Sequence, residues 1–392
     1  VGIAAGFLLL RLWESRGLVG GYDAAVYWQG AHAFVRGGDP YAIDTFVVPP
    51  TALPLIAAIG WLPFRVAYLL LQLVAATAMT AALALLGRSV GLTNRGALLG
   101  SLLAVAWSSG TFETYGFGNL NGVILLCEAL VILASLGGDE RRVGLWFGLS
   151  LAVKPVLAPF GLMLLCQRRW RAAAWSTVPP VVTLAMAIAL GGGTGFLRRA
   201  VPGLLDSFNH RFLKSDVSLR GLGEREHLPS ALVTSLRVVL VIACTWAALV
   251  VWRAARPTTW WDRRTVVLVE LGSVLLIGTF LAAPFGWRYY SVFLLPWLVH
   301  VLATHRPHPP PVLHVLAWSL LLLPDSLGLR FDQGGAPTLN RERPTLALLL
   351  LLIAAFLDAR RGGARAPDQP ARPAAWLSSE AKREVSSDPP LI

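Results

Sequence analysis

The stretch from 64 to 86, FRVAYLLLQLVAATAMTAALALL, decides the class of fold. From 66 onward it holds no charged side chain, and about 20 apolar residues are what a helix needs to cross a membrane. Similar runs recur along the 392-residue chain, which is 55% hydrophobic and only 14% charged. An ordinary soluble domain is about 25% charged. The sequence therefore predicts an all-α polytopic membrane protein.

The apolar runs predict about 10–11 membrane helices. Arginines gather in short loops on one side, for example Arg141 with Arg142 and Arg263 with Arg264, and this excess marks the cytoplasmic side. The longer loops then lie on the outer face, at 15–63, 111–118, 191–229, 284–287 and 325–343. The predicted spans are 1–14, 64–86, 96–110, 119–137, 172–190, 230–252, 265–283, 288–303, 311–324 and 344–357.

The segment 143–165, VGLWFGLSLAVKPVLAPFGLMLL, does not fit a simple crossing. Both of its flanks, DERR and QRRWR, are basic. Proline removes a backbone donor and restricts the residue before it, so the helix should break at Lys154–Pro155. We expect a re-entrant hairpin or a pair of half-helices, which is tolerated only where it is buried or lines a cavity.

Several classes of function are disfavoured. The net charge of +12 comes from arginines between apolar runs, which indicates topology rather than nucleic-acid binding. The three cysteines show neither metal-ligand spacing nor a disulfide framework. Nucleotide-binding, nucleophile-elbow and HExxH motifs are absent, and we expect no metal and no cofactor. No internal repeat is evident, which weakens a transporter interpretation.

The sequence also predicts the extent of the membrane domain and the character of both ends of the chain. Residues 1–357 should form the membrane domain, and the Pro-, Ala-, Arg- and Glu-rich residues 358–392 a disordered cytoplasmic tail. The first apolar run is short and opens at Val1, so we expect further residues upstream. No small-residue cleavage site of a signal peptide follows it.

GYDAAVYWQG, residues 21–30, places one carboxylate, Asp23, just where a membrane segment ends. A carboxylate there is costly unless it is hydrated, paired or functional. Asp23 is either a solvated loop acid or a general base at the mouth of a membrane-embedded cavity. Its neighbours Tyr22, Tyr27 and Trp28 suit an interface belt and equally a sugar-stacking wall.

Further polar candidates follow in chain order. The proline-rich residues 46–63 favour short helices along the outer interface, or a plain hydrophobic loop. Asn119 and Asn121 precede an apolar run, where they either cap a helix or bind sugar hydroxyls. Glu128 lies inside that run and is a buried-pair or functional candidate.

The cationic candidates lie farther along the chain. Lys154 needs an anion, such as a phosphate or Asp23, unless it snorkels to the interface. Arg288, beside Tyr289 and Tyr290, either anchors a helix or holds a lipid phosphate. The loop around Asp206 and Asp216 is either merely solvated or suited to an anionic headgroup through His210, Arg211, Lys214 and Arg220.

Taken in order, these pieces resemble glycosyltransferase family 87. The order is an early Asp near tyrosines, GGDPY, a proline pair, NLNG, LSLAVKPVLAPFGLMLLCQRRWRA and RYYSVFLLP, with the KPVLAPFGLMLLCQRRWRA block the most specific. The resemblance covers about residues 15–360 and implies a GT-C fold and a polyprenyl-phosphate sugar donor. Mannosyltransferases of the family usually carry Gly-Gln before the Asn. This chain has NLNG instead, which is similar to the branch of the family formed by the arabinofuranosyltransferases that introduce branches into mycobacterial arabinan. That branch tends to carry adjacent acids near Asp23, whereas this chain has one.

The resemblance implies a specific reaction at the extracytoplasmic face of the plasma membrane. A hydroxyl of a cell-wall polysaccharide or glycolipid attacks a decaprenyl-phosphate arabinofuranose with inversion, Asp23 takes the proton, and Lys154 and Arg288 stabilise the leaving phosphate. We expect a monomer in contact with membrane lipids. Three alternatives remain: a polyprenyl-phosphate-mannose-dependent mannosyltransferase, a lipid or sugar transporter or flippase, and a membrane scaffold.

Overall fold

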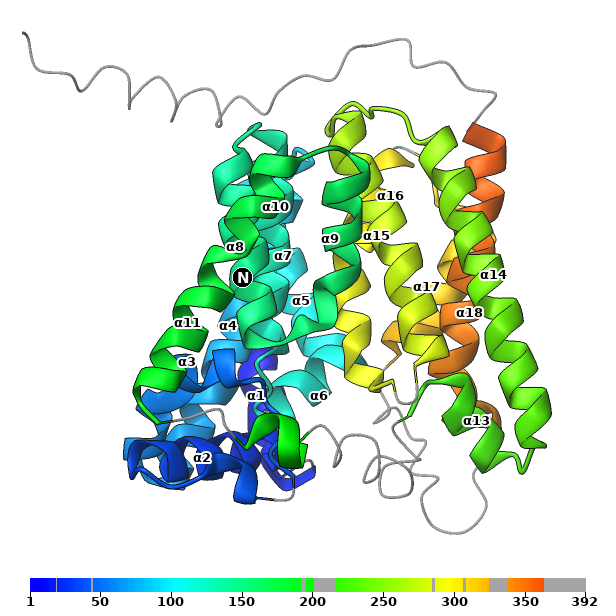
Figure 1. Cartoon of the computed structure of the whole chain (residues 1–392). Helices are drawn as coiled ribbons and strands as arrows, with labels where there is room; N and C mark the ends of the chain where they lie inside the picture. The colour runs from blue at the N-terminus through cyan, green and yellow to red at the C-terminus, as the bar shows by residue number, and fades with distance from the viewer. Residues whose placement is uncertain are drawn as a thin grey trace, which may run out of the picture.

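The computed structural model describes residues 1–18, 20–43, 45–191, 195–200, 216–283, 286–305, 308–323 and 338–362. The residues in these ranges are overwhelmingly helical, and the only β-pairing among them is an isolated bridge between Asp216 and Trp287. Figure 1 shows the long helices lying roughly side by side, with α2 lying across their lower end. The predicted all-α architecture is confirmed.

The first half of the chain supplies one side of the bundle. The 26 residues of α4 extend about 39 Å. Its elements are α1 (Gly2–Leu18), α2 (Tyr22–Val35), η1 (Pro40–Ala42), η2 (Pro50–Ala52), α3 (Leu53–Ile56), η3 (Ala57–Trp61), α4 (Phe64–Ser89), α5 (Asn94–Trp107), α6 (Ser109–Phe117), α7 (Asn121–Leu136), α8 (Glu140–Val153), η4 (Pro155–Leu157), α9 (Ala158–Cys166), α10 (Trp170–Ser176) and α11 (Val178–Ala189).

The second half completes the bundle around α15, the most buried of its long helices. Its elements are the π-helical turn η5 (Phe196–Ala200), α13 (Leu219–Arg225), α14 (Ser230–Ala254), α15 (Arg263–Ala282), η7 (Arg288–Leu294), α16 (Leu295–Thr304), α17 (Val312–Leu322) and α18 (Thr338–Gly362). Because α18 continues through Gly362, residues 358–362, which we expected in the tail, are helical.

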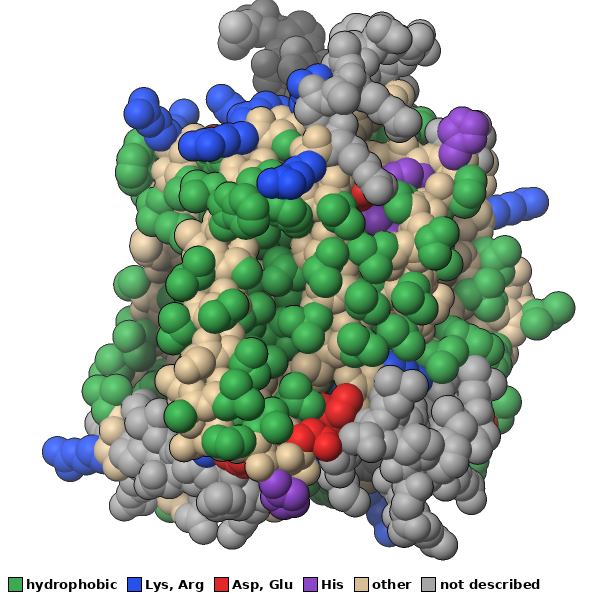
Figure 2. Space-filling model, turned by 90° about the vertical axis from the view of Figure 1, so that its right-hand side faces the viewer, with side chains coloured by type: hydrophobic (Ala, Val, Ile, Leu, Met, Phe, Trp, Pro, Cys, Tyr) green, Lys and Arg blue, Asp and Glu red, His purple; other side chains and the backbone are tan. Residues whose placement is uncertain are grey.

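Four helical stretches in the described ranges are long and apolar enough to cross a membrane: Phe64–Ser89, Trp170–Ala189, Ser230–Ala254 and Arg263–Ala282. Several other predicted spans are shorter apolar helices, including Asn121–Leu136 and Val312–Leu322. Figure 2 shows a broad band of hydrophobic side chains with lysines and arginines gathered along its upper rim. The connections α7–α8, α9–α10 and α14–α15 lie at one end of the bundle (Figure 1), and we call it the arginine-rich end because Arg141, Arg142, Arg168, Arg171, Arg253, Arg256, Arg263 and Arg264 lie in or beside them.

The segment 143–165 turns back on itself. α8 ends at Val153, Lys154 is extended (φ −165°), and α9 begins at Ala158. Arg169, just beyond α9, forms an ion pair of 2.9 Å with Glu140 at the start of α8. The two ends of the segment therefore lie together and the predicted break is confirmed, whereas the prediction that both ends face the cytoplasm is tested below.

Other boundaries differ from the sequence prediction. The predicted span 96–110 ends at Trp107, because Ser108 is extended and starts a new helix. Most of the predicted outer loop 111–118 is therefore helical and belongs to α6. The predicted span 288–303 opens with the 3-10 helix η7 and continues as α16, where Pro296 occupies the first turn, as Pro tolerates.

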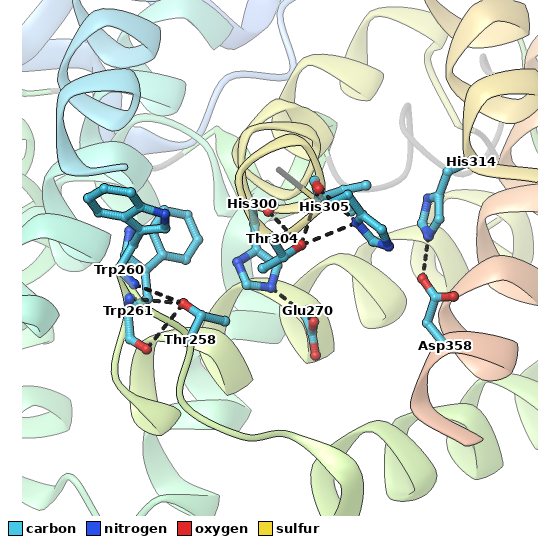
Figure 3. A network of polar contacts seen from close by, with 10 residues as sticks. Thr258, Trp260, Trp261, Glu270, His300, Thr304, His305, His314 and Asp358 are labelled. Carbon is cyan, nitrogen blue, oxygen red and sulfur yellow. Dashed lines mark hydrogen bonds and ion pairs between the residues drawn. The ribbon is translucent and has the colours of Figure 1, made fainter. Parts of the chain in front are cut away.

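Two histidine–carboxylate pairs join the last four helices at the arginine-rich end. His300 Nε2 lies 3.0 Å from Glu270, which connects α16 to α15. His314 Nε2 lies 2.6 Å from Asp358, which connects α17 to α18. Figure 3 shows both pairs, with Trp261 stacked on His300 at 5.0 Å. Each polar contact thus joins two neighbouring helices within the bundle.

A second, smaller core lies under α2. Its members are Ala24, Tyr27, Ala31 and Phe34 of α2 with apolar residues of 41–71. Gly60 lets the backbones meet, because a Cβ there would lie 2.6 Å from the carbonyl of Ala31. The proline-rich segment therefore forms short helices packed on α2, as expected, and seats Asp23 next to the main bundle.

Candidate active site

Asp23 lies in the first turn of α2 and is partly buried. Its carboxylate accepts a hydrogen bond from Asn119 Nδ2 at 2.5 Å, and the Tyr289 hydroxyl is close enough to help stabilise its ionised form. Lys154 is close enough to act on it electrostatically. The structure thus brings together residues from four segments that are far apart in the sequence.

Gly118 sets the close approach of α2 to the α6–α7 junction. It ends α6 in the left-handed conformation (φ +69°), which favours glycine, and a Cβ there would lie 2.7 Å from Ala24 Cβ. Asn119 follows at once, and its Oδ1 accepts from the Asn121 N–H at 2.8 Å. Because that oxygen is committed to a backbone donor, the Nδ2 group is the one that faces Asp23.

Lys154 is placed by the break after α8. Its backbone N–H still bonds to Ser150, while Thr51 Oγ1 donates to the Ala152 carbonyl at 2.7 Å and ties the break to the segment under α2. The ammonium lies 4.9 Å from the Tyr290 ring centroid and 5.6 Å from that of Tyr289. Aromatic faces hold a cation without neutralising it. Within the described ranges no carboxylate lies within ion-pair distance of Lys154.

Burial raises the pKa of the Asp23 carboxyl above its ordinary value. The positive charge of Lys154, the hydrogen bond from Asn119 and the nearby Tyr289 hydroxyl oppose this effect by stabilising the ionised form. Asn119 fills one of the roughly four acceptor positions of the carboxylate, and Tyr289 lies near it, which leaves capacity for a hydroxyl group. The arrangement suits a general base, because these three groups favour the ionised form that accepts a proton.

Tyr27 completes the cluster. Burial, and secondarily the Asp23 charge, raise the pKa of its hydroxyl well above the usual value, so it stays protonated and can donate. Asn121 is fully buried, and neither its Oδ1 nor its Nδ2 meets a hydrogen-bond partner in the described part of the chain. A buried amide is costly without partners. Asn121 therefore remains a candidate for binding substrate.

Other predicted site residues lie elsewhere or take structural contacts. Trp28 donates to the Leu62 carbonyl at 2.8 Å and stacks on His32, so it packs the small core rather than facing Asp23. Tyr22 is exposed. Arg220 pairs with Glu224, one turn along α13, at 2.8 Å. His210, Arg211, Lys214 and Asp206 lie outside the described residues.

Arg288 forms an ion pair with Glu113 of α6, a residue that the sequence analysis missed. Glu113 is 7% exposed. The signal available in the sequence is that Glu113 is a lone acid four residues before Phe117. In the structure the centroid of the Phe117 ring lies 5.8 Å from that of Tyr289. Glu128, at 1% exposure, is buried in α7 as the sequence suggested.

The architecture, with its broken re-entrant segment and its carboxylate, amide, lysine and tyrosines gathered at one end, is that of a multi-pass membrane protein of the GT-C type. The chain belongs to glycosyltransferase family 87, whose model matches residues 46–284. The family expected from the sequence is thereby confirmed.

The chain is similar to curated members of two kinds. An "Alpha-(1->3)-arabinofuranosyltransferase" of Mycobacterium tuberculosis is 31% identical over 286 residues, covering 68% of this chain and 63% of the relative. A protein of the same name from Corynebacterium glutamicum is 25% identical over 348 residues, covering 86% and 80%. A "Polyprenol-phosphate-mannose-dependent alpha-(1-2)-phosphatidylinositol pentamannoside mannosyltransferase" of M. tuberculosis is 26% identical over 328 residues, covering 77% and 70%. The chain thus spans less than two thirds of the length of the first of these relatives.

Proposed function

We propose that this protein transfers an arabinofuranosyl unit from a polyprenyl-phosphate donor to a hydroxyl of a cell-wall arabinan or lipoglycan, with inversion. The observation that carries the proposal is the convergence of Asp23, Asn119, Lys154 and Tyr289. A base beside a cation held on aromatic rings matches the needs of glycosyl transfer from a lipid phosphate. The membrane-embedded fold suits a donor with a polyprenyl tail.

The reaction makes one bond and breaks one. The acceptor oxygen bonds to the anomeric carbon as the bond from that carbon to the phosphate oxygen breaks, and the acceptor proton passes to Asp23. The phosphate leaves ionised and requires no general acid. Lys154 stabilises its charge, an effect that is strongest in a site shielded from water.

Arabinose is the preferred sugar because two of the relatives described carry arabinofuranosyltransferase names and the 31% identity is the highest of the three. The mannosyltransferase relative makes a polyprenyl-phosphate mannose donor the second candidate. The clustering of arginines at the other end of the bundle supports an extracytoplasmic location for Asp23 in the plasma membrane.

In the test, the protein is purified in lipid nanodiscs and given a synthetic arabinan acceptor. Its two candidate donors are decaprenyl-phosphoryl-arabinofuranose and polyprenyl-phosphate mannose. We expect transfer of arabinose, and a loss of about 10²–10⁴-fold in Asp23→Asn. Asp262→Asn is the matched control, because Asp262 caps α15 at the arginine-rich end. Transfer of mannose only would establish the second candidate. Near-normal turnover by Asp23→Asn would exclude Asp23 as the base.

A further inference from the structure

Asp216 is a buried carboxylate outside the cluster around Asp23. It is 4% exposed and lies just before α13. Its Oδ1 accepts from the Ser218 N–H at 2.9 Å and from the Gly286 N–H at 2.8 Å. One oxygen thus joins two segments that are 70 residues apart. A side chain that only capped its own turn would bond to Ser218 alone.

The contact continues through the backbone toward the site. Val217 N–H donates to the Gly286 carbonyl at 2.7 Å, and Asp216 and Trp287 form the antiparallel bridge. The Trp287 ring stacks on Tyr289 with centroids 5.2 Å apart and planes 9° apart. Tyr289 is one of the groups, with Asn119 and Lys154, that stabilise the ionised form of Asp23. Asp216 is therefore linked to the base through three consecutive contacts.

Asp216 and Val217 are themselves held in place by contacts that lead to α18. Arg225 donates to the Asp216 carbonyl at 2.5 Å and binds Glu342 with two parallel hydrogen bonds, of 2.7 and 2.6 Å. Thr345 Oγ1 donates to the Val217 carbonyl at 3.1 Å. A paired guanidinium and carboxylate fix direction as well as distance. Asp216 thus transmits the position of a packed helix to the Gly286–Trp287 segment.

We propose that Asp216 is a positioning residue for the transfer reaction: it fixes Gly286 and Trp287 so that Tyr289 stays directed at Asp23. This inference rests on the proposed role of Asp23 as base. Of the residues between α15 and η7, the structure describes Ala283, Gly286 and Trp287, and none of these three lies in a helix. The positions of Gly286 and Trp287 are therefore set by tertiary contacts, and Asp216 supplies a buried side-chain anchor for them.

The test measures rate against pH in the full-length protein in nanodiscs. The titratable groups facing Asp23 are Lys154, Tyr27 and Tyr289. Tyr289 favours the ionised carboxylate, so its loss moves the acid limb of the profile to higher pH. We expect Asp216→Ala to lower kcat about 10- to 100-fold, as a displacement of about 1 Å does. It should also move the acid limb in the same direction as Tyr289→Phe.

Three further variants separate positioning from simple support of the fold. Asp216→Asn keeps the accepting oxygen and should restore most of the rate and the acid limb. In Tyr289→Phe, adding Asp216→Ala should move the limb no further, because the group that it positions is already gone. Asp262→Ala removes a similar helix cap at the arginine-rich end and should leave the limb unchanged.

The inference is overturned if Asp216→Ala lowers only the melting temperature, or if its limb shift adds to that of Tyr289→Phe. Should Asp216→Ala fail to fold, Trp287→Leu removes only the ring stacked on Tyr289, and an unmoved limb there overturns the inference equally. Absence of any transfer by the wild-type protein would refute the proposed function instead. Wild-type transfer with a normal Asp216→Ala variant refutes this inference alone.

Discussion

Replacing Asn119 by alanine tests how the base is tuned. The Asn119 Nδ2 group donates to Asp23 at 2.5 Å, a hydrogen bond to a charged acceptor. Such bonds contribute about 1.5–3 kcal/mol, and about 1.4 kcal/mol corresponds to one pKa unit. Losing it should therefore raise the pKa of Asp23 by about 1–2 units, in addition to the rise that burial already causes.

The sign determines the expected profile. Only ionised Asp23 accepts the proton, so activity rises with pH through the pKa of that carboxyl. In Asn119→Ala the acid limb of kcat/KM should move up by about 1–2 pH units, with the largest loss on the acid side of the profile and much of the rate recovered on the alkaline side. The assay is the initial rate of sugar transfer from the lipid donor between pH 5 and 9.

Asn121→Ala is the matched control for this profile. Asn121 is also a buried amide at the start of α7, but its side chain makes no hydrogen bond to Asp23. It should lower substrate affinity and leave the acid limb in place. An unmoved limb in Asn119→Ala would show that Asn119 does not tune the base, or that Asp23 is not the base.

Three further predictions concern the cation, the pH dependence of stability and the hairpin. Lys154→Ala should weaken donor binding by about 2 kcal/mol, roughly 30-fold, in donor titrations, and Arg288→Ala by less, because Arg288 already pairs with Glu113; equal losses would contradict this ranking. Burial raises the folded-state pKa of Asp23 above its unfolded value, so its contribution to stability is present at low pH and lost as pH rises through the folded pKa. The melting temperature of Asp23→Asn should accordingly fall less than that of the wild type between pH 4 and 8. Parallel curves of melting temperature against pH would refute this prediction. Cysteines at positions 138 and 167 should both react with an impermeant thiol reagent from the cytoplasmic side only, whereas labelling of either from outside would mean that the segment crosses.

Much of the architecture followed from local composition. Apolar runs and arginine clusters indicate helices and their orientation wherever they stand in the chain, because transfer into hydrocarbon depends on the segment itself. The break at Lys154–Pro155 was equally local, since proline constrains its own backbone and its neighbour. Asp23 stood out for the same reason, as one charge at the edge of an apolar run.

The sequence by itself determined which residues could do chemistry, and tertiary structure decided which of them act together. Asn119 could be a cap or a ligand, and it reaches Asp23 only because Gly118 lets α2 pack against the α6–α7 junction. Trp28 is an aromatic residue of the kind that stacks on sugars, but it donates to the Leu62 carbonyl and stacks on His32 instead. Arg288 could hold a phosphate, but it meets a carboxylate 175 residues away in the chain. Contacts between distant segments depend on how whole helices pack, and no local pattern of residues encodes that packing.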